Sequence, residues 1–501
     1  MADKVKYITQ LNGGLRLDIP STLMKSSFST GLRNVKVTKE EITTRDGYEV
    51  LGDNLPLDSP VTTLRQFTSY DGDIHTVAFT HDDILRLDPD NNWVSILGTN
   101  NWTSDYTLPA RTAFINNTLL ATNFNNEMVE WDGEASSVNT ISNASSYRAK
   151  DLVPFNYRML YGHMEENGEP VPQRVRWTEI GTYDNFTDGY AGFVDLVDTP
   201  GSIVAMEPLG ESMVIYKDDS IVMCNWVGGK NVFSFETRVS HVGLVAPRGV
   251  VNLGDRHLFL AQDNIYEFTG GRTVQPVGEQ IQKEVPQLIA SEYIERSIAT
   301  RYGDEAWFIV PIEDEVPDTA YVLNWREGRW YKHNVASTGL GTYVDTDIVT
   351  IGDLDMEIGD IGGRIGDLGG VSVRPRIILG DTDGYIYKMS STKSDDAGTV
   401  ITNYWDSKDF VLGEEYKTRY NRFRAIEFDA KGDSLEVLYS IDSGESWNYI
   451  DEQVLTESYE WHTLWFDDSA RKIRFRFRNK NTNESFSLRT FKIIYKEGAT
   501  R

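Results

Sequence analysis

The chain has 501 residues, of which 49 are Lys or Arg and 76 are Asp or Glu, so its formal net charge is −27 at pH 7. Affinity for phosphates comes from clustered cations, so this charge balance argues against a protein that grips DNA or an anionic membrane surface. One cysteine excludes an internal disulfide, and no window approaches the roughly 20 apolar residues of a membrane-spanning helix. We expect a soluble chain of two to four domains, made in a reducing compartment.

Residues 1–60 are irregular and rich in turn residues. A segment of this kind lacks the regular apolar pattern that a core of its own would need. We therefore expect an N-terminal arm that packs on another part of the molecule.

Apolar strands recur from about residue 61 to residue 396. Their apolar residues alternate, or form runs of four to six bounded by Gly, Asp, Asn and Pro, which indicates strands rather than helices. A first set of strands begins at His75, Thr118, Tyr157, Ser212, Arg256, Glu305 and Pro375. A second set follows at Asp83, Glu127, Gln173, Ser220, Asn264, Ala320 and Gly384.

The spacing of these strand pairs predicts a β-propeller. Successive strands of the first set start 43, 39, 55, 44, 49 and 70 residues apart, which brackets the roughly 40 to 50 residues of a four-stranded blade. One blade cannot bury both faces of its sheet, so blades stack around a ring and cover one another. We predict an all-β protein with a propeller of six or seven blades at 61–396. The alternative is a set of stacked β-sandwiches with ordinary hairpin spacing.

A Gly/Asp-rich insert at 345–370 lengthens the seventh repeat. Ile-Gly-Asp recurs there every seven residues, at Ile351, Ile358 and Ile365. Each of its seven glycines would cost a helix about 1 kcal/mol, so repeated turns are expected instead. The candidates for a channel lining or gate are the acidic residues Asp353, Asp355, Glu357, Asp360 and Asp367. The alternative is a surface loop whose aspartates only cap turns.

The paired-strand signature ends near residue 401. Longer strands then begin at Arg422, Ser434, Arg471 and Phe486, with polar turns between them. This pattern predicts a separate C-terminal β-sandwich at 401–501.

One C-terminal strand has an aromatic face and a basic face. Alternation places Ile473, Phe475 and Phe477 on the side that faces the core. The arginines of the opposite side are candidates for subunit contacts: Arg474, Arg476 and Arg478. We expect them to pair with carboxylates such as Glu427 and Asp429 on a neighbouring strand or subunit.

The sequence contains no motif that predicts catalysis or metal binding. It lacks His-Glu-x-x-His, a phosphate-binding loop and Gly-x-Ser-x-Gly. Ser440, Asp442, Gly444 and Trp447 resemble the Asp-box of sialidase-like propellers, a pattern that stabilises a hairpin and does no chemistry. We predict that the protein is not an enzyme and holds no cofactor and no metal ion.

The N-terminal segment carries a family resemblance. Leu11-Asn12-Gly13-Gly14-Leu15, the run STGLRNVKV at 29–37, and Arg45-Asp46-Gly47-Tyr48 resemble the opening of tail hub or nozzle proteins of short-tailed bacteriophages. The Ile-Gly-Asp-Leu repeats are similar to short Asp-Leu repeats of phage tail proteins. The resemblance spans about residues 11 to 390.

This resemblance implies a structural virion protein, located in the phage tail after synthesis in the bacterial cytoplasm. It implies a propeller-based homohexamer below the portal and adaptor rings, with tail fibre, spike or needle proteins as further partners. The hexameric channel would retain packaged double-stranded DNA and conduct it during ejection, without sequence-specific binding. An acidic channel wall would let DNA slide, because it offers no cations to the phosphates.

Two alternatives remain. A carbohydrate-active or glycan-binding propeller is suggested by the single Asp-box and by twelve tryptophans that could stack on sugars. An arginine triad around a central pocket would favour it, and no spacing in the sequence identifies one. A generic propeller scaffold is the other alternative, and it predicts a monomer.

Overall fold

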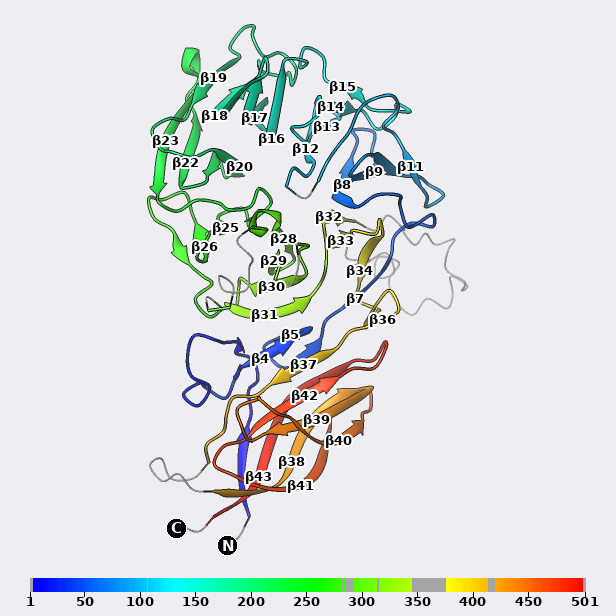
Figure 1. Cartoon of the computed structure of the whole chain (residues 1–501), viewed down its shortest axis with the longest axis vertical. Coiled ribbons are helices and arrows are strands. Elements are labelled where there is room, and N and C mark those ends of the chain that lie inside the picture. The colour runs from blue at the N-terminus through cyan, green and yellow to red at the C-terminus, as the bar shows by residue number, and fades with distance from the viewer. Residues whose placement is uncertain are drawn as a thin grey trace, which may run out of the picture.

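The computed structural model describes residues 3–105, 107–281, 283–284, 292–312, 315–344, 375–412 and 420–498. Sheets dominate these residues, as predicted, and the only helices among them are two single 3₁₀ turns, η1 (Gly229–Asn231) and η2 (Ile294–Arg296). No helix in the described ranges has the length and apolar character to cross a bilayer. The molecule has two parts, a ring of sheets and a smaller unit below it (Figure 1).

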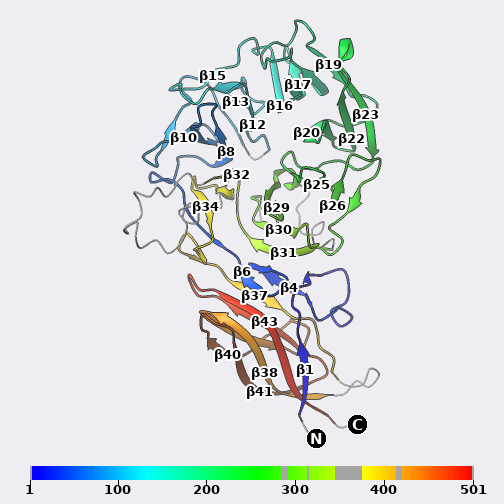
Figure 2. The same cartoon turned by 180° about the vertical axis from the view of Figure 1, so that it is seen from behind.

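Six four-stranded antiparallel sheets and one six-stranded sheet follow one another around the ring (Figures 1 and 2). The strands at the ring centre are β8 (Val61–Thr68), β12 (Arg111–Ile115), β16 (Tyr147–Phe155), β20 (Ile203–Leu209), β24 (Val250–Asn252), β28 (Ile298–Tyr302) and β32 (Gly339–Tyr343). The second strands are β9 (Ile74–Thr80), β13 (Thr118–Thr122), β17 (Arg158–Glu166), β21 (Ser212–Lys217), β25 (His257–Leu260), β29 (Glu305–Val310) and β33 (Arg376–Gly380). This arrangement is that of a β-propeller and confirms the predicted fold class.

The outer half of each sheet completes the ring. The third strands are β10 (Ile84–Leu87), β14 (Val129–Trp131), β18 (Glu169–Trp177), β22 (Ser220–Trp226), β26 (Ile265–Phe268), β30 (Thr319–Asn324) and β34 (Ile386–Ser390). The fourth strands are β11 (Trp93–Ser95), β15 (Asn139–Thr140), β19 (Gly192–Asp195), β23 (Phe233–Ser240), β27 (Gln275–Pro276), β31 (Arg329–Asn334) and β7 (Gly47–Val50). The apolar runs predicted from the sequence are the second and third strands.

The last sheet takes its fourth strand from the N-terminal segment. Strand β7 pairs antiparallel with β34, with Val50 opposite Tyr387 and Gly47 opposite Ser390. Short strands β35 (Asp395–Asp396) and β36 (Thr399–Val400) extend the same sheet. The ring is thus closed by residues that lie before its first strand in the sequence. The segment 1–60, expected as an arm, supplies part of the propeller itself.

Two further sheets form the smaller part, which we call the two-sheet unit. One has the order β41-β38-β43-β6-β5, with β1 beside β43, and the other has the order β4-β37-β42-β39-β40. Its N-terminal strands are β1 (Lys4–Ile8), β4 (Gly31–Arg33), β5 (Val35–Val37) and β6 (Ile42–Thr44). The others are β37 (Asn403–Asp406), β38 (Asn421–Gly432), β39 (Ser434–Ser440), β40 (Asn448–Val454), β41 (Glu460–Ala470), β42 (Arg474–Asn479) and β43 (Phe486–Glu497).

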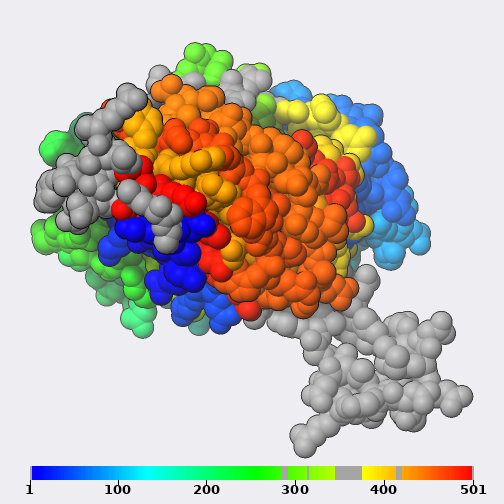
Figure 3. Space-filling model, turned by 90° about the horizontal axis from the view of Figure 1, so that it is seen from below, coloured from blue at the N-terminus to red at the C-terminus, as the bar shows by residue number. Residues whose placement is uncertain are grey.

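The two sheets of this unit pack face to face through aromatic rings. Phe491 of the first sheet lies 5.2 Å from Phe477 and 6.2 Å from Trp405 of the second, measured between ring centroids. All three side chains are fully buried. Residues 401–501 therefore share their core with strands from 1–60. Figure 3 shows this end of the molecule, where the blue N-terminal segment lies against the orange and red C-terminal strands.

The ring and the two-sheet unit meet at the buried Arg45 side chain. Its guanidinium donates in bidentate fashion to Asp396, with Nη1 2.9 Å from Oδ1, and also donates to the Asn334 carbonyl at 3.1 Å. Arg45 Nε donates to Asn34 Oδ1 at 3.1 Å, and the Asn34 amide donates to the Thr402 carbonyl at 2.9 Å. Two ring sheets and the start of the two-sheet unit are thereby fixed at one point.

Two glycines of the N-terminal motifs are required by close approach of backbones at this junction. Gly14 has φ +78°, and a Cβ there would lie 2.8 Å from the carbonyl oxygen of Trp330. At Gly47 a Cβ would lie 1.9 Å from the carbonyl oxygen of Asp395. Any side chain at either position would displace the backbone of the ring.

Replacing Arg45 by Leu should destabilise the protein by about 3 kcal/mol, because Asp396, whose side chain is only 13% exposed, would lose its charge partner. Urea unfolding followed by tryptophan fluorescence measures the change. The matched control is Arg326→Leu, which breaks an exposed pair with Asp304 and should cost about 1 kcal/mol or less. Equal effects of the two substitutions would contradict the central role of Arg45.

Candidate functional site

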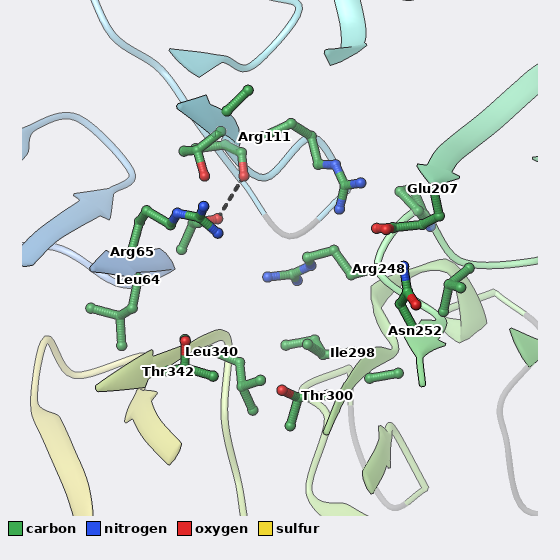
Figure 4. A pocket seen from close by; sticks show the side chains of 18 of the residues that line it. Leu64, Arg65, Arg111, Glu207, Arg248, Asn252, Ile298, Thr300, Leu340 and Thr342 are labelled. Atoms are coloured by element: carbon green, nitrogen blue, oxygen red, sulfur yellow. Dashed lines mark hydrogen bonds between the residues drawn. The ribbon is translucent and has the colours of Figure 1, made fainter. Parts of the chain in front are cut away.

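A cavity of about 500 Å³ lies at the centre of the ring. Its walls come from the first strands of the ring sheets and from the segment just before β24. Figure 4 shows the side chains of Arg65, Arg111 and Arg248, which extend from different parts of the ring into this space, with Glu207 on the side opposite Arg65. The volume falls within the range of about 300–1,000 Å³ that is typical of small-molecule sites.

Arg111 is held by a buried carboxylate. Its Nε donates to Asp151 Oδ1 at 2.9 Å, and Asp151 also accepts the backbone N–H groups of Leu152 at 3.0 Å and Met206 at 2.6 Å. Burial of Arg111 lowers its pKa, but the charges of Asp151 and then Glu207 outweigh burial and raise it overall. Arg111 therefore keeps its charge and has its main partner within the wall.

Arg248 reaches across the cavity to the far side of the ring. Its Nη1 donates to the carbonyl oxygens of Thr62 at 2.8 Å and Thr338 at 3.0 Å. These acceptors fix the guanidinium without neutralising it. Burial lowers the pKa of Arg248 to about 9, and the nearby charge of Arg111 contributes to the same shift.

Arg65 projects from β8 and is exposed within the cavity. The surrounding protein walls lower its pKa by desolvation, Glu207 raises it, and Arg111 lowers it further. Within the described residues, neither Arg65 nor Arg248 lies at salt-bridge distance from a carboxylate. Arg301, the fourth arginine of the lining, donates through Nε to the Gly303 carbonyl at 3.1 Å. Arg65 and Arg248 are therefore uncompensated by direct pairing.

Among the described residues that line the cavity, Glu207 is the one acidic residue. Burial raises its pKa to about 7, while Arg111 and a hydrogen bond with Asn252 oppose the shift and Asp151 adds to it. Near neutral pH this group is only partly ionised, so it offsets less than one positive charge. The arrangement is suited to binding an anion. Among the described residues, no cluster of three His, Cys, Asp or Glu side chains is placed to hold a metal ion.

The site residues predicted from the sequence lie elsewhere. The acidic candidates of the insert, Asp353, Asp355, Glu357, Asp360 and Asp367, fall outside the described residues. The basic candidates lie on β42, and their aromatic neighbours Phe475 and Phe477 are fully buried, as predicted.

The β42 arginines are paired inside the chain. Arg474 Nε donates to Asp409 at 2.9 Å, Arg476 Nε donates to Asp406 at 2.6 Å, and Arg478 Nε donates to Glu436 at 2.7 Å. The prediction that these arginines pair with Glu427 and Asp429 was wrong, because both carboxylates lie on β38 in the other sheet. There Glu427 pairs with Lys492. The three guanidinium groups of β42 thus have their charge partners within one molecule.

The Asp-box residues form the turn between β39 and β40. Ser440 Oγ donates to Asp442 Oδ1 at 2.6 Å and accepts the backbone N–H of Gly444 at 2.7 Å. The Trp447 ring lies under Arg476, with 4.1 Å from the guanidinium carbon to the ring centroid. These contacts stabilise a hairpin, as the sequence pattern predicted.

Sequence reasoning missed the arginines of the cavity lining. The repeat was recognised from its second and third strands, whereas Arg65 and Arg111 lie on first strands and Arg248 lies just before one. The available signal was a charged residue inside a short apolar segment, as in Leu64-Arg65 and Ala110-Arg111.

No protein-family model matches the chain, and a search of curated proteins gives no match. Several solved structures are similar at low identity. BamB from Moraxella catarrhalis is 10% identical with a TM-score of 0.37, covering 77% of this chain and 97% of that chain. YCF48 from Cyanidioschyzon merolae is 11% identical with a TM-score of 0.37, covering 68% and 98%. The computationally designed Ika8 protein is 13% identical with a TM-score of 0.37, covering 75% and 99%. The site is therefore interpreted from its own residues.

Glu207 should make stability depend on pH between its ordinary pKa of 4.5 and its folded value of about 7. The folded state favours the protonated form, so this stabilisation is complete below pH 4.5 and is lost as the pH rises through 7. Glu207→Gln, which stays neutral, should exceed the wild type in unfolding free energy by about 3 kcal/mol at pH 8, and by about 1 kcal/mol or less at pH 5.

Urea unfolding at the two pH values measures this difference. The matched control is Glu211→Gln in the exposed turn that follows β20. This substitution should change the unfolding free energy by the same small amount at both pH values. A Glu207→Gln variant that is less stable than the wild type at pH 8 would contradict the assignment.

Proposed function

We propose that this protein is a structural component of a short-tailed phage tail, a nozzle or hub whose copies form a hexameric channel. The channel retains packaged double-stranded DNA and conducts it during ejection. In this proposal the protein is not an enzyme, it resides in the virion, and its neighbours are the portal-adaptor ring and the tail fibre, spike or needle proteins.

The junction between the two parts of the molecule carries this proposal. The N-terminal motifs that resemble nozzle proteins are the segments that tie the ring to the two-sheet unit. Gly14 lies against β31 of the ring. Strands β5 and β6 belong to the two-sheet unit, whereas β7 closes the ring. One hydrophobic cluster also runs from Trp307 in the ring to Phe491 in the two-sheet unit. A tube wall that holds back pressurised DNA needs this kind of rigid connection.

The DNA path in this proposal runs between subunits and not through the ring of one chain. A cavity of about 500 Å³ has the size of a small-molecule site, so it leaves no room for a DNA duplex to pass. Its uncompensated arginines would also hold phosphates rather than release them. A surface with excess carboxylates, as the charge of −27 provides, suits the sliding path better.

A carbohydrate-active or glycan-binding propeller is the second candidate. Arg65, Arg111 and Arg248 around the central cavity are the feature that favours it. The described lining, however, contains one aromatic ring, Phe114. Sugar faces commonly stack on aromatic side chains, so this cavity offers recognition of an acidic group and little surface for a neutral sugar.

Electron microscopy of the purified chain, alone and mixed with a portal-adaptor complex, tests the nozzle proposal. We expect a hollow sixfold ring, formed either spontaneously or only on the adaptor, because obligate assembly can depend on a neighbouring ring. A chain that stays monomeric in both samples while binding or cleaving glycans would overturn the proposal and support the second candidate.

The acidic residues of the insert are proposed to face the channel. Changing Asp353, Asp355, Asp360 and Asp367 to Lys should slow DNA ejection from assembled particles, because cations placed on the wall would attract passing phosphates. The slowing should be larger at low salt, since screening weakens the attraction. The matched control changes these aspartates to Asn. Unchanged ejection in the Lys variant would place the insert away from the DNA path.

A further inference from the structure

The uncompensated charge of the central cavity points to a ligand. The chain carries 76 carboxylates against 49 Lys and Arg residues, so a cation has many possible partners. The arginines of β42 illustrate the usual outcome, each with a carboxylate within hydrogen-bond distance. Arg65 and Arg248 depart from this pattern, although both line the cavity at the centre of the ring.

The carboxylates near the cavity do not neutralise these two groups. Asp151 is 2% exposed, pairs with Arg111 and accepts two backbone N–H groups, so its oxygens are already used. Glu207 has its pKa raised to about 7 and is only partly ionised at neutral pH. The described cavity lining therefore keeps an excess of positive charge.

The guanidinium groups are positioned for a shared guest. Arg248 is anchored through Nη1 to the Thr62 and Thr338 carbonyls, which leaves its Nε and Nη2 donors free of any partner in the described structure. Arg65 approaches the same space from β8, and Arg111 approaches it from β12 (Figure 4). A planar guanidinium presents parallel donors that match the oxygens of a carboxylate or a phosphoryl group.

We propose that the central cavity binds a small molecule through an oxyanion group, a carboxylate or a phosphoryl group, which Arg65 and Arg248 hold directly with Arg111 beside them. The volume of about 500 Å³ admits a metabolite-sized ligand and excludes a nucleic acid duplex. The Thr300 and Thr342 hydroxyls of the lining supply further polar contacts. The inference does not depend on hexamer formation.

Titration calorimetry of the full-length chain with inorganic phosphate, and separately with succinate, tests the proposal. We expect one binding site per chain for at least one of these anions, despite the repulsion expected from a net charge of −27. Arg65→Gln and Arg248→Gln should each weaken binding at least tenfold. The matched control is Arg256→Gln, which alters an arginine paired with Asp255 and Glu267 outside the cavity lining and should leave binding unchanged.

Comparing the two anions shows which acidic group the natural ligand carries. Tighter phosphate binding assigns a phosphoryl ligand, and tighter succinate binding assigns a carboxylate ligand. Absence of binding by both anions, or equal affinities in the wild type and in both cavity variants, would overturn the proposal. A chain that binds the anion but never forms a ring would overturn the nozzle proposal and leave this site intact.

Thermal unfolding is an independent test, because it detects binding even when the heat of binding is too small for calorimetry. Without added anion, Arg65→Gln should melt at a higher temperature than the wild type, because the substitution removes an uncompensated charge from the cavity. With added phosphate or succinate, the wild type should gain stability and Arg65→Gln should gain much less. A variant that melts below the wild type without anion, and still gains as much from the anion, would contradict the site.

Discussion

The buried guanidinium of Arg45 is the point on which the architecture depends. It joins Asn34, the end of β31 and the carboxylate of Asp396, so residues more than 300 positions apart in the sequence meet around one side chain. Burial raises the pKa of Asp396, and Arg45 opposes that shift, so each charge depends on the other inside the protein. A ring that takes its last strand from the N-terminal segment needs such an anchor, because β7 is short and has only four residues.

The distribution of charge separates two kinds of arginine in this protein. On β42 each guanidinium faces a carboxylate of a neighbouring strand or loop, and Arg476 is also enclosed between the rings of Tyr404 and Trp447. In the central cavity the arginines are held by backbone carbonyls, by Asp151, or by no described partner. The arrangement on β42 stabilises the fold. In the cavity, the cations without a carboxylate partner would be stabilised by a bound anion.

The sequence predicted the strands that stand out as apolar runs and missed several that do not. In β9 the last five residues are buried in succession, and β29 also ends in five buried residues, so both stand out as apolar runs. Strand β15 has two exposed residues, and β12 has one buried residue among five, in part because Arg111 and Thr112 line the cavity. Such strands exist through pairing with their neighbours rather than through their own pattern. The cavity arginines were hidden for the same reason.

Closure of the ring by β7 has a consequence for how the protein folds during synthesis. The ribosome releases β7 before any strand of the ring, yet its partner β34 is made more than 300 residues later. Strand β1 likewise waits for β43, close to the other end of the chain. Until then these strand edges have no partner, and the last ring sheet cannot form. Pairings between such distant residues are slow and leave edges open to association with other chains. Folding of this protein is therefore completed only after nearly the whole chain has been translated.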